Sequence, residues 1–229
     1  MLEKYLQELQ TLLTDSPSPA ALMASSRACI NIHNMATAHS LDSSCSNRQK
    51  RINQMAQLKR QCCQLLCQPS LGCDDRVVTA TALFMLQFAP VLSIVDDECE
   101  NEALHMAWEA LDGYRTSGNA SASLCADVEL LDTLASQNPD EMERLLHDTI
   151  AALQISTPAS PSHVKLICRA IDLATLCGFA SAADLDTVSR HIAAARCCTT
   201  EQKLQLLSCR IAAACMAATQ AISATALPA

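Results

Sequence analysis

The sequence predicts an all-α protein of about ten short helices, stacked as antiparallel hairpins into a compact helical bundle or a short irregular α-solenoid. Three observations predict this class: half of the 229 residues are apolar, only 3% are aromatic, and there are only four glycines. An interior of Ala, Leu, Ile, Val, Met and Cys favours closely packed helices, whereas sheets prefer β-branched and aromatic residues and need many tight turns. A chain of this length can bury a core without disulfides.

The first two predicted helices are separated by a turn that contains proline. Residues 2–14 form a short amphipathic helix that ends at the DSPSP turn. Its apolar face consists of Leu2, Leu6, Leu9 and Leu13. Ser18 followed by Pro19 is a typical N-cap and first-turn pair, so we expect a second helix from there to about His39.

Two further helices are expected in the first half of the chain. Apolar residues at helical spacing over 52–66 predict a third helix, which ends before Pro69. Asp74 and Asp75 can cap a fourth helix, and residues 77–95 then pass without a charge. Such a run suits either a membrane span or a helix that is buried on all sides. Both flanks are acidic and lack the usual Lys and Arg anchors, which favours the buried helix.

Periodicity and capping signals predict the helices of the second half. Apolar spacing gives helices over 98–111 and 124–134. The sequence NPDE at 138–141 then caps a helix that continues to about residue 153. The STPASPS segment at 156–162 follows, and it is the best linker in the chain.

Three helices are expected after this linker. The first begins near Val164 and is closed by the glycine at 178. The other two begin at capping boxes, in which a polar side chain and the side chain three residues later each accept the other residue's backbone N–H. These capping boxes are Ser181 with Asp184, and Thr199 with Gln202.

The linker suggests how the chain is divided. We expect an N-terminal amphipathic helix (1–14), a main helical domain (19–155) and a C-terminal helical subdomain (163–224) that packs on the main domain. The N-terminus has no basic leader followed by an apolar run, so the expected compartment is the cytoplasm. Most of the fourteen cysteines should be thiols there.

Four cysteines lie in the stretch RQCCQLLCQPSLGC at 60–73. A helical wheel places Cys62 on the apolar face, with Cys63 and Cys67 at its edge near Lys59 and Arg60. Nearby cations lower a thiol pKa, whereas the C-terminal end of a helix raises it. A zinc site is the best metal-binding alternative, with the ligands Cys29, His33, Cys63 and Cys67. Burial in the core is favoured for these residue types, so we expect neither a metal nor a cofactor.

One segment of this acidic chain is basic. The formal net charge is −8, yet no acid occurs between Ser43 and Cys73. The bases of this segment are Arg48, Lys50, Arg51, Lys59 and Arg60. They form no single stripe and no aromatic residue lies among them, which disfavours nucleic acid as a partner. An acidic protein, or the chain's own DDECENE at 96–102, fits this segment better.

No common catalytic or nucleotide-binding motif occurs in the sequence. We therefore expect a non-enzymatic interaction factor, such as an adaptor, a chaperone-like factor or an assembly subunit, which binds other proteins through its helix faces and is compatible with homo-oligomers. The expected partner-binding residues are the four leucines of 2–14 and the five bases of 48–60. Two alternatives stay open: a Cys/His-rich metal or redox-thiol protein centred on 29–67, and a membrane-associated subunit that uses 77–95.

Overall fold

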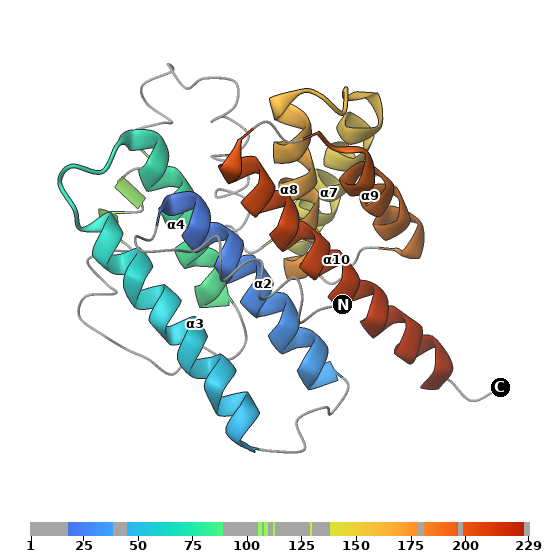
Figure 1. The fold of residues 1–229 in the computed structure, drawn as a ribbon, viewed down its shortest axis with the longest axis horizontal. Helices are drawn as coiled ribbons and strands as arrows, with labels where there is room; N and C mark the ends of the chain where they lie inside the picture. The colour runs from blue at the N-terminus through green and yellow to red at the C-terminus, as the bar shows by residue number, and fades with distance from the viewer. Residues whose placement is uncertain are drawn as a thin grey trace.

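The computed structural model describes residues 18–38, 45–88, 138–177, 181–196 and 199–226, and single positions between 105 and 129. Within these residues the chain is helical, with no strand, which confirms the all-α class (Figure 1). The helices are α2 (Pro19–Ala38), α3 (Cys45–Leu66), α4 (Cys73–Phe88), α7 (Pro139–Ile155), α8 (Pro161–Cys177), α9 (Ala182–Ala194) and α10 (Thr200–Ala226). The helix predicted over 2–14 lies outside the described residues, as do most positions of those predicted over 98–111 and 124–134.

The helix starts follow the capping signals of the sequence. The Ser18 hydroxyl accepts the N–H of Ala21 at 3.2 Å at the start of α2. Asn138 caps α7, ahead of Pro139 and two acids in the first turn. Both predicted capping boxes are present: Ser181 pairs with Asp184 at α9, and Thr199 with Gln202 at α10. These hydrogen bonds satisfy N–H groups that have no partner inside the helix.

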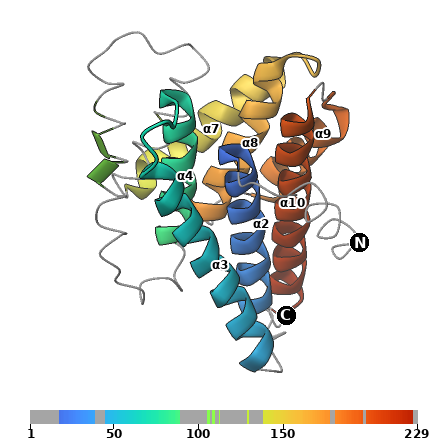
Figure 2. The same ribbon diagram turned by 60° about the vertical axis from the view of Figure 1, so that its left-hand side comes forward.

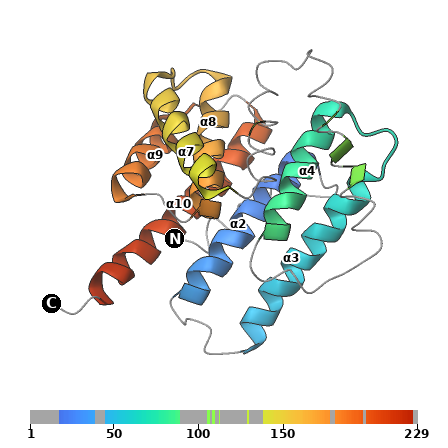
Figure 3. The same ribbon diagram turned by 180° about the vertical axis from the view of Figure 1, so that it is seen from behind.

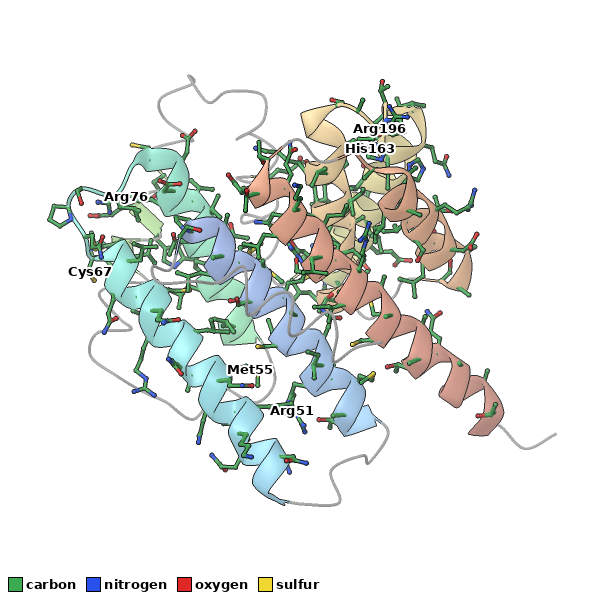
Figure 4. The ribbon with its side chains drawn as sticks, in the orientation of Figure 1. Arg51, Met55, Cys67, Arg76, His163 and Arg196 are labelled. Atoms are coloured by element: carbon green, nitrogen blue, oxygen red, sulfur yellow. The ribbon has the colours of Figure 1, made fainter. Side chains whose placement is uncertain are left out.

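A single arginine closes the corner between α3 and α4. The guanidinium of Arg76, in the first turn of α4, donates to the carbonyl oxygens of Leu66 at 3.2 Å, Gln68 at 3.0 Å and Leu71 at 3.2 Å (Figure 4). The last carbonyls of a helix have no intrahelical partner, and a cation there also complements the helix dipole. Arg76 therefore holds the C-terminal end of α3 against the start of α4.

The packing order differs from the predicted series of consecutive hairpins. The consecutive pairs α3/α4 and α7/α8 do pack together, but α2 packs most extensively against α10, the last helix of the chain. Figure 2 shows α2 lying between α4 and α10. The reason is the small side chains of α2, which let neighbouring helices approach closely. They include Ala20, Ala21, Ala24, Ser25, Ser26 and Ala28, all buried.

In the uncharged segment that begins at Val77, residues 77–86 are buried apart from the half-buried Val78, as expected for a core helix. Val77, Leu83 and Leu86 are all fully buried in α4. The helix ends at Phe88, and residues 89–95 lie outside the described residues. Among the described helices, none is both long and apolar enough to cross a bilayer.

The linker predicted at 156–162 is a short and well-bonded connection between α7 and α8, but its last two residues already belong to α8. The N–H of Ser160 donates to the carbonyl of Thr157 at 2.8 Å, and the N–H of Arg196, after α9, donates to the carbonyl of Pro158 at 3.1 Å. His163 follows at the start of α8, where it is fully buried and bonded to Ser156 (Figure 4). The connection therefore ties α7, α8 and the end of α9 together.

Candidate functional site

Helix α3 lies at the edge of the molecule and offers one long solvent-facing side. It packs against α2 and α4, on the side of the molecule opposite to α7, α8 and α9 (Figure 3). Its inward face contains Met55 and Leu66, which are completely buried. No carboxylate occurs in its 22 residues. From residue 47 onward, the exposed side chains of α3 are basic or amide-bearing: Asn47, Arg48, Gln49, Lys50, Asn53, Gln54, Gln57, Arg60 and Gln64.

The five predicted partner-binding bases occupy three different environments. Arg48, Lys50 and Arg60 are exposed, Arg48 at the N-terminal end of α3 and the other two on its outward side, and we call these three residues the α3 basic surface. Arg51 is half-buried and lies between α3 and the C-terminal end of α2 (Figure 4). Lys59 is only 4% exposed, because it lies one turn after Met55 on the inward face. Lys59 therefore does not belong to the exposed surface. The leucines predicted at positions 2, 6, 9 and 13 lie outside the described residues.

The charge at the N-terminal end of α3 is not compensated within the helix. Arg48 and Lys50 lie in its first two turns, and its first turn contains no acid. Unpaired N–H groups and the dipole make a helix N-terminus positive, so additional cations there are unfavourable. An anionic partner would relieve this repulsion. The local electrostatics therefore favours a negatively charged ligand on this surface.

The predicted zinc ligands do not form a metal site. All four are described, and no three His, Cys, Asp or Glu side chains of the described residues lie close enough to hold a metal ion. His33 is buried, with its Nε2 atom 3.4 Å from the Thr37 hydroxyl on the same helix. Burial raises the pKa of Cys29 to about 11. Burial and then the neighbouring Cys63 raise the pKa of Cys62 to about 12. Both therefore stay protonated at neutral pH.

A buried ion pair joins α2 to α8 and α10. Arg27 and Asp172 are each 1% exposed, and their guanidinium and carboxylate groups form a two-pronged pair in which Nη2 lies 2.7 Å from Oδ2. The Nη1 atom of Arg27 donates to Gln205 at 2.8 Å and to Ser208 at 2.7 Å, both on α10. Four of the five N–H groups of Arg27 are thereby used inside the protein. This pair is a structural junction between three helices.

Charge and burial act in opposite directions on this pair. Burial lowers the pKa of Arg27, but Asp172, and then Cys209 and Cys168 in their thiolate forms, raise it by more, so the net shift is upward and Arg27 stays charged. Burial raises the pKa of Asp172 more than Arg27 lowers it. A buried carboxylate of this kind depends on its partner cation to remain ionised.

A cavity of about 310 Å³ opens beside the ion pair. Its walls come from α2, α4, α8 and α10, and its charged lining residues are Arg27, Lys165, Arg169, Asp172 and Glu201. Cys168 of α8 also lines it. A volume near 300 Å³ is at the lower end for small-molecule sites, so this cavity suits a small polar molecule or a few waters.

Sequence reasoning did not detect the features around this cavity. Arg27 and Asp172 are 145 residues apart in the chain, and Cys168 and Cys209 are 41 residues apart. The only signal for the pair was an arginine on the small-residue helix α2 and an aspartate within the apolar pattern of α8. In the sequence, Arg27 and Asp172 are two isolated charges, and only the arrangement of α2 and α8 in the fold shows that they form a pair.

Comparison with known proteins gives no match. No protein-family model, no curated protein and no solved structure is similar to this chain. What the protein does must therefore be inferred from its own residues.

Proposed function

We propose that this protein is a non-enzymatic interaction module that binds an acidic segment of another protein through the α3 basic surface. One observation supports this proposal above all: an edge helix of 22 residues carries no carboxylate, although the chain as a whole has a net charge of −8. Such a local excess of positive charge on an acidic protein steers an anionic partner to one place.

The surface chemistry favours an acidic peptide as the partner. Lys50 and Arg60 lie on the outward side of α3 together with Asn53 and Gln57, whose amides can bond to peptide groups. Some of these polar groups also bond along the helix: Gln49 donates to Asn53 at 2.9 Å, in the same exposed row. In a bound acidic peptide, the carboxylates would pair with the cations of α3, and the backbone N–H and C=O groups would bond to the neighbouring amide side chains.

The rest of the fold presents this surface in a fixed shape. Met55, Cys62 and Leu66 hold the inward face of α3 in the core, and Arg76 holds its C-terminal end. A partner that binds to an already ordered helix loses less conformational entropy in the complex.

The proposal is tested with a fluorescently labelled peptide of Asp and Glu residues and the full-length protein. The variant R48E/K50E/R60E should reduce binding by at least tenfold, and the binding of the original protein should weaken as salt is added. The matched control R144E/K203E/R210E reverses three exposed bases on α7 and α10, so it changes the net charge equally. It should retain binding.

Three results would overturn the proposal. The first is equal loss of binding in the test and control variants, because this would mean that only net charge matters. The second is stronger binding of a DNA or RNA duplex of the same charge than of the peptide. The third is an α3 charge reversal without effect. A second labelled peptide with the sequence DDECENE should bind through the same surface if the chain's own segment at 96–102 competes for it.

A further inference from the structure

Two thiols face each other between α8 and α10. Cys168 and Cys209 are both free thiols, and their Sγ atoms are 3.6 Å apart, with the S–H of Cys209 donating to Cys168. The two helices pack directly against each other. A disulfide needs sulfur atoms about 2.05 Å apart. The two sulfurs are thus already neighbours, and a small movement of their side chains would bring them to bonding distance.

Access to the two thiols is unequal. Cys209 is fully buried, whereas Cys168 is half-buried and lines the 310 Å³ cavity. A small molecule in the cavity can contact Cys168, whereas Cys209 is not among the residues that line the cavity. This is the arrangement of an attacking thiol with a resolving thiol behind it.

The two thiols have different hydrogen-bond partners: the S–H of Cys168 donates to the Oε1 atom of Gln205 at 3.9 Å, and the S–H of Cys209 donates to Cys168. Arg27 lies near both thiols, whose thiolate forms would raise its pKa, and its guanidinium is already paired with Asp172. Burial, and then the hydrogen bond to Cys168, raise the pKa of Cys209 well above its ordinary value. Cys209 therefore keeps its proton and donates it in a hydrogen bond to the sulfur of Cys168.

We propose that Cys168 and Cys209 form a reversible dithiol that is oxidised by a small hydroperoxide entering the cavity. The thiolate of Cys168 attacks one peroxide oxygen, the O–O bond breaks, and Cys168 becomes a sulfenic acid. The second oxygen leaves and takes up the proton that Cys168 gave, so that hydrogen peroxide yields water. The thiol of Cys209 then attacks the Cys168 sulfur, the S–S bond forms, and the S–O bond breaks. The hydroxyl group leaves with the proton of Cys209 as a second water, and a dithiol reductant restores both thiols.

The expected product can be assigned without ambiguity. Cleavage after Lys and Arg releases Cys168 in the peptide LICR at 166–169 and Cys209 in the peptide LQLLSCR at 204–210, each with a single cysteine. The reduced full-length protein is treated with an equimolar amount of hydrogen peroxide, alkylated, digested and analysed by mass spectrometry. We expect the two peptides to be joined, with the loss of two hydrogens, and to separate after reduction.

Variants distinguish the two roles. C209A should accumulate a sulfenic acid at Cys168 that dimedone traps, whereas C168A should leave Cys209 reduced. The control is C73A, which removes an exposed thiol and should not change the rate of linkage. Circular dichroism and the melting temperature show that each variant is folded. Since both thiols are part of the packing, the conservative variants C168S and C209S are measured alongside.

The proposal fails if peroxide oxidises Cys73 or Cys67 while the 166–169 and 204–210 peptides stay reduced in the original protein. It also fails if Cys209 is oxidised equally fast in C168A. Neither result bears on acidic-peptide binding at α3, which these variants leave unchanged.

Discussion

Arg27 is the most consequential single residue of the described structure. Its guanidinium is 1% exposed and joins α2 to Asp172 on α8 and to two side chains of α10. A buried ion pair is not in itself evidence of high stability, because removing two charges from water costs as much as their attraction returns. Its effect becomes visible when one partner is removed and the other is left buried without a counter-charge.

We therefore expect R27M to lower the free energy of unfolding by about 3–5 kcal/mol. The double variant R27M/D172L should be more stable than R27M alone, because it also removes the stranded carboxylate. Urea unfolding followed by circular dichroism measures both. The control is R190M, which breaks an exposed pair with Asp186 at 3.1 Å and should cost less than about 1 kcal/mol. Equal losses in R27M and R190M would show that the buried pair is not a structural junction.

At the scale of helices, Arg76 of α4 supplies hydrogen bonds that the C-terminal end of α3 lacks. Its three hydrogen bonds go to the carbonyls of Leu66, Gln68 and Leu71, of which that of Gln68 also accepts the N–H of Leu71. R76A should lower the free energy of unfolding by about 1–2 kcal/mol. The stability of R76K should lie between those of R76A and the original protein, since an ammonium group cannot bond to three carbonyls in the same geometry.

Hydrogen exchange locates this effect. The amides of the last turn of α3 should exchange faster in R76A, while those of α7 remain protected. R60A is the control. The Nε atom of Arg60 donates to the carbonyl of Ala56 in the same helix at 3.3 Å, so removing the Arg60 side chain should leave exchange in α3 nearly unchanged. Uniformly faster exchange over α2, α3 and α4 in R76A would instead indicate global destabilisation.

The same elements show which features a sequence reveals and why. Helix starts such as Asn138 and Ser181 could be predicted because a cap depends on residues two or three positions away. Burial of Lys59 and the contact of Cys168 with Cys209 could not, because both depend on which helix faces meet. The pairing of α2 with α10 could not be predicted for the same reason. The small side chains of α2 allow another helix to approach closely, but they do not determine which helix it is.

At the scale of the whole molecule, one core connects the two parts that the sequence separates at 156–162. A single cluster of buried apolar side chains has members in every described helix, from Leu22 in α2 to Cys209 in α10. A second, smaller cluster consists only of α2 and α10 residues, among them Ala24 and Ile211. Helix α2 therefore has much of its buried surface in contact with the C-terminal end of the chain.

This continuity predicts how the chain behaves when it is cut. The fragment 1–162 lacks α9, α10 and all but the first two residues of α8, so the faces of α2 around Ala24 and Arg27 would be exposed to water. We expect this fragment to show no cooperative urea transition and no protection of the α2 amides, and we expect the fragment 163–229 to be equally unstable alone. Mixing the two should restore the helical signal and a single transition, because the extensive contacts of α2 with α10 form between the two fragments and need no covalent link. A sigmoidal transition of 1–162 with protected α2 amides would instead show that the region 19–155 folds independently, and that α10 only adds to a core already formed.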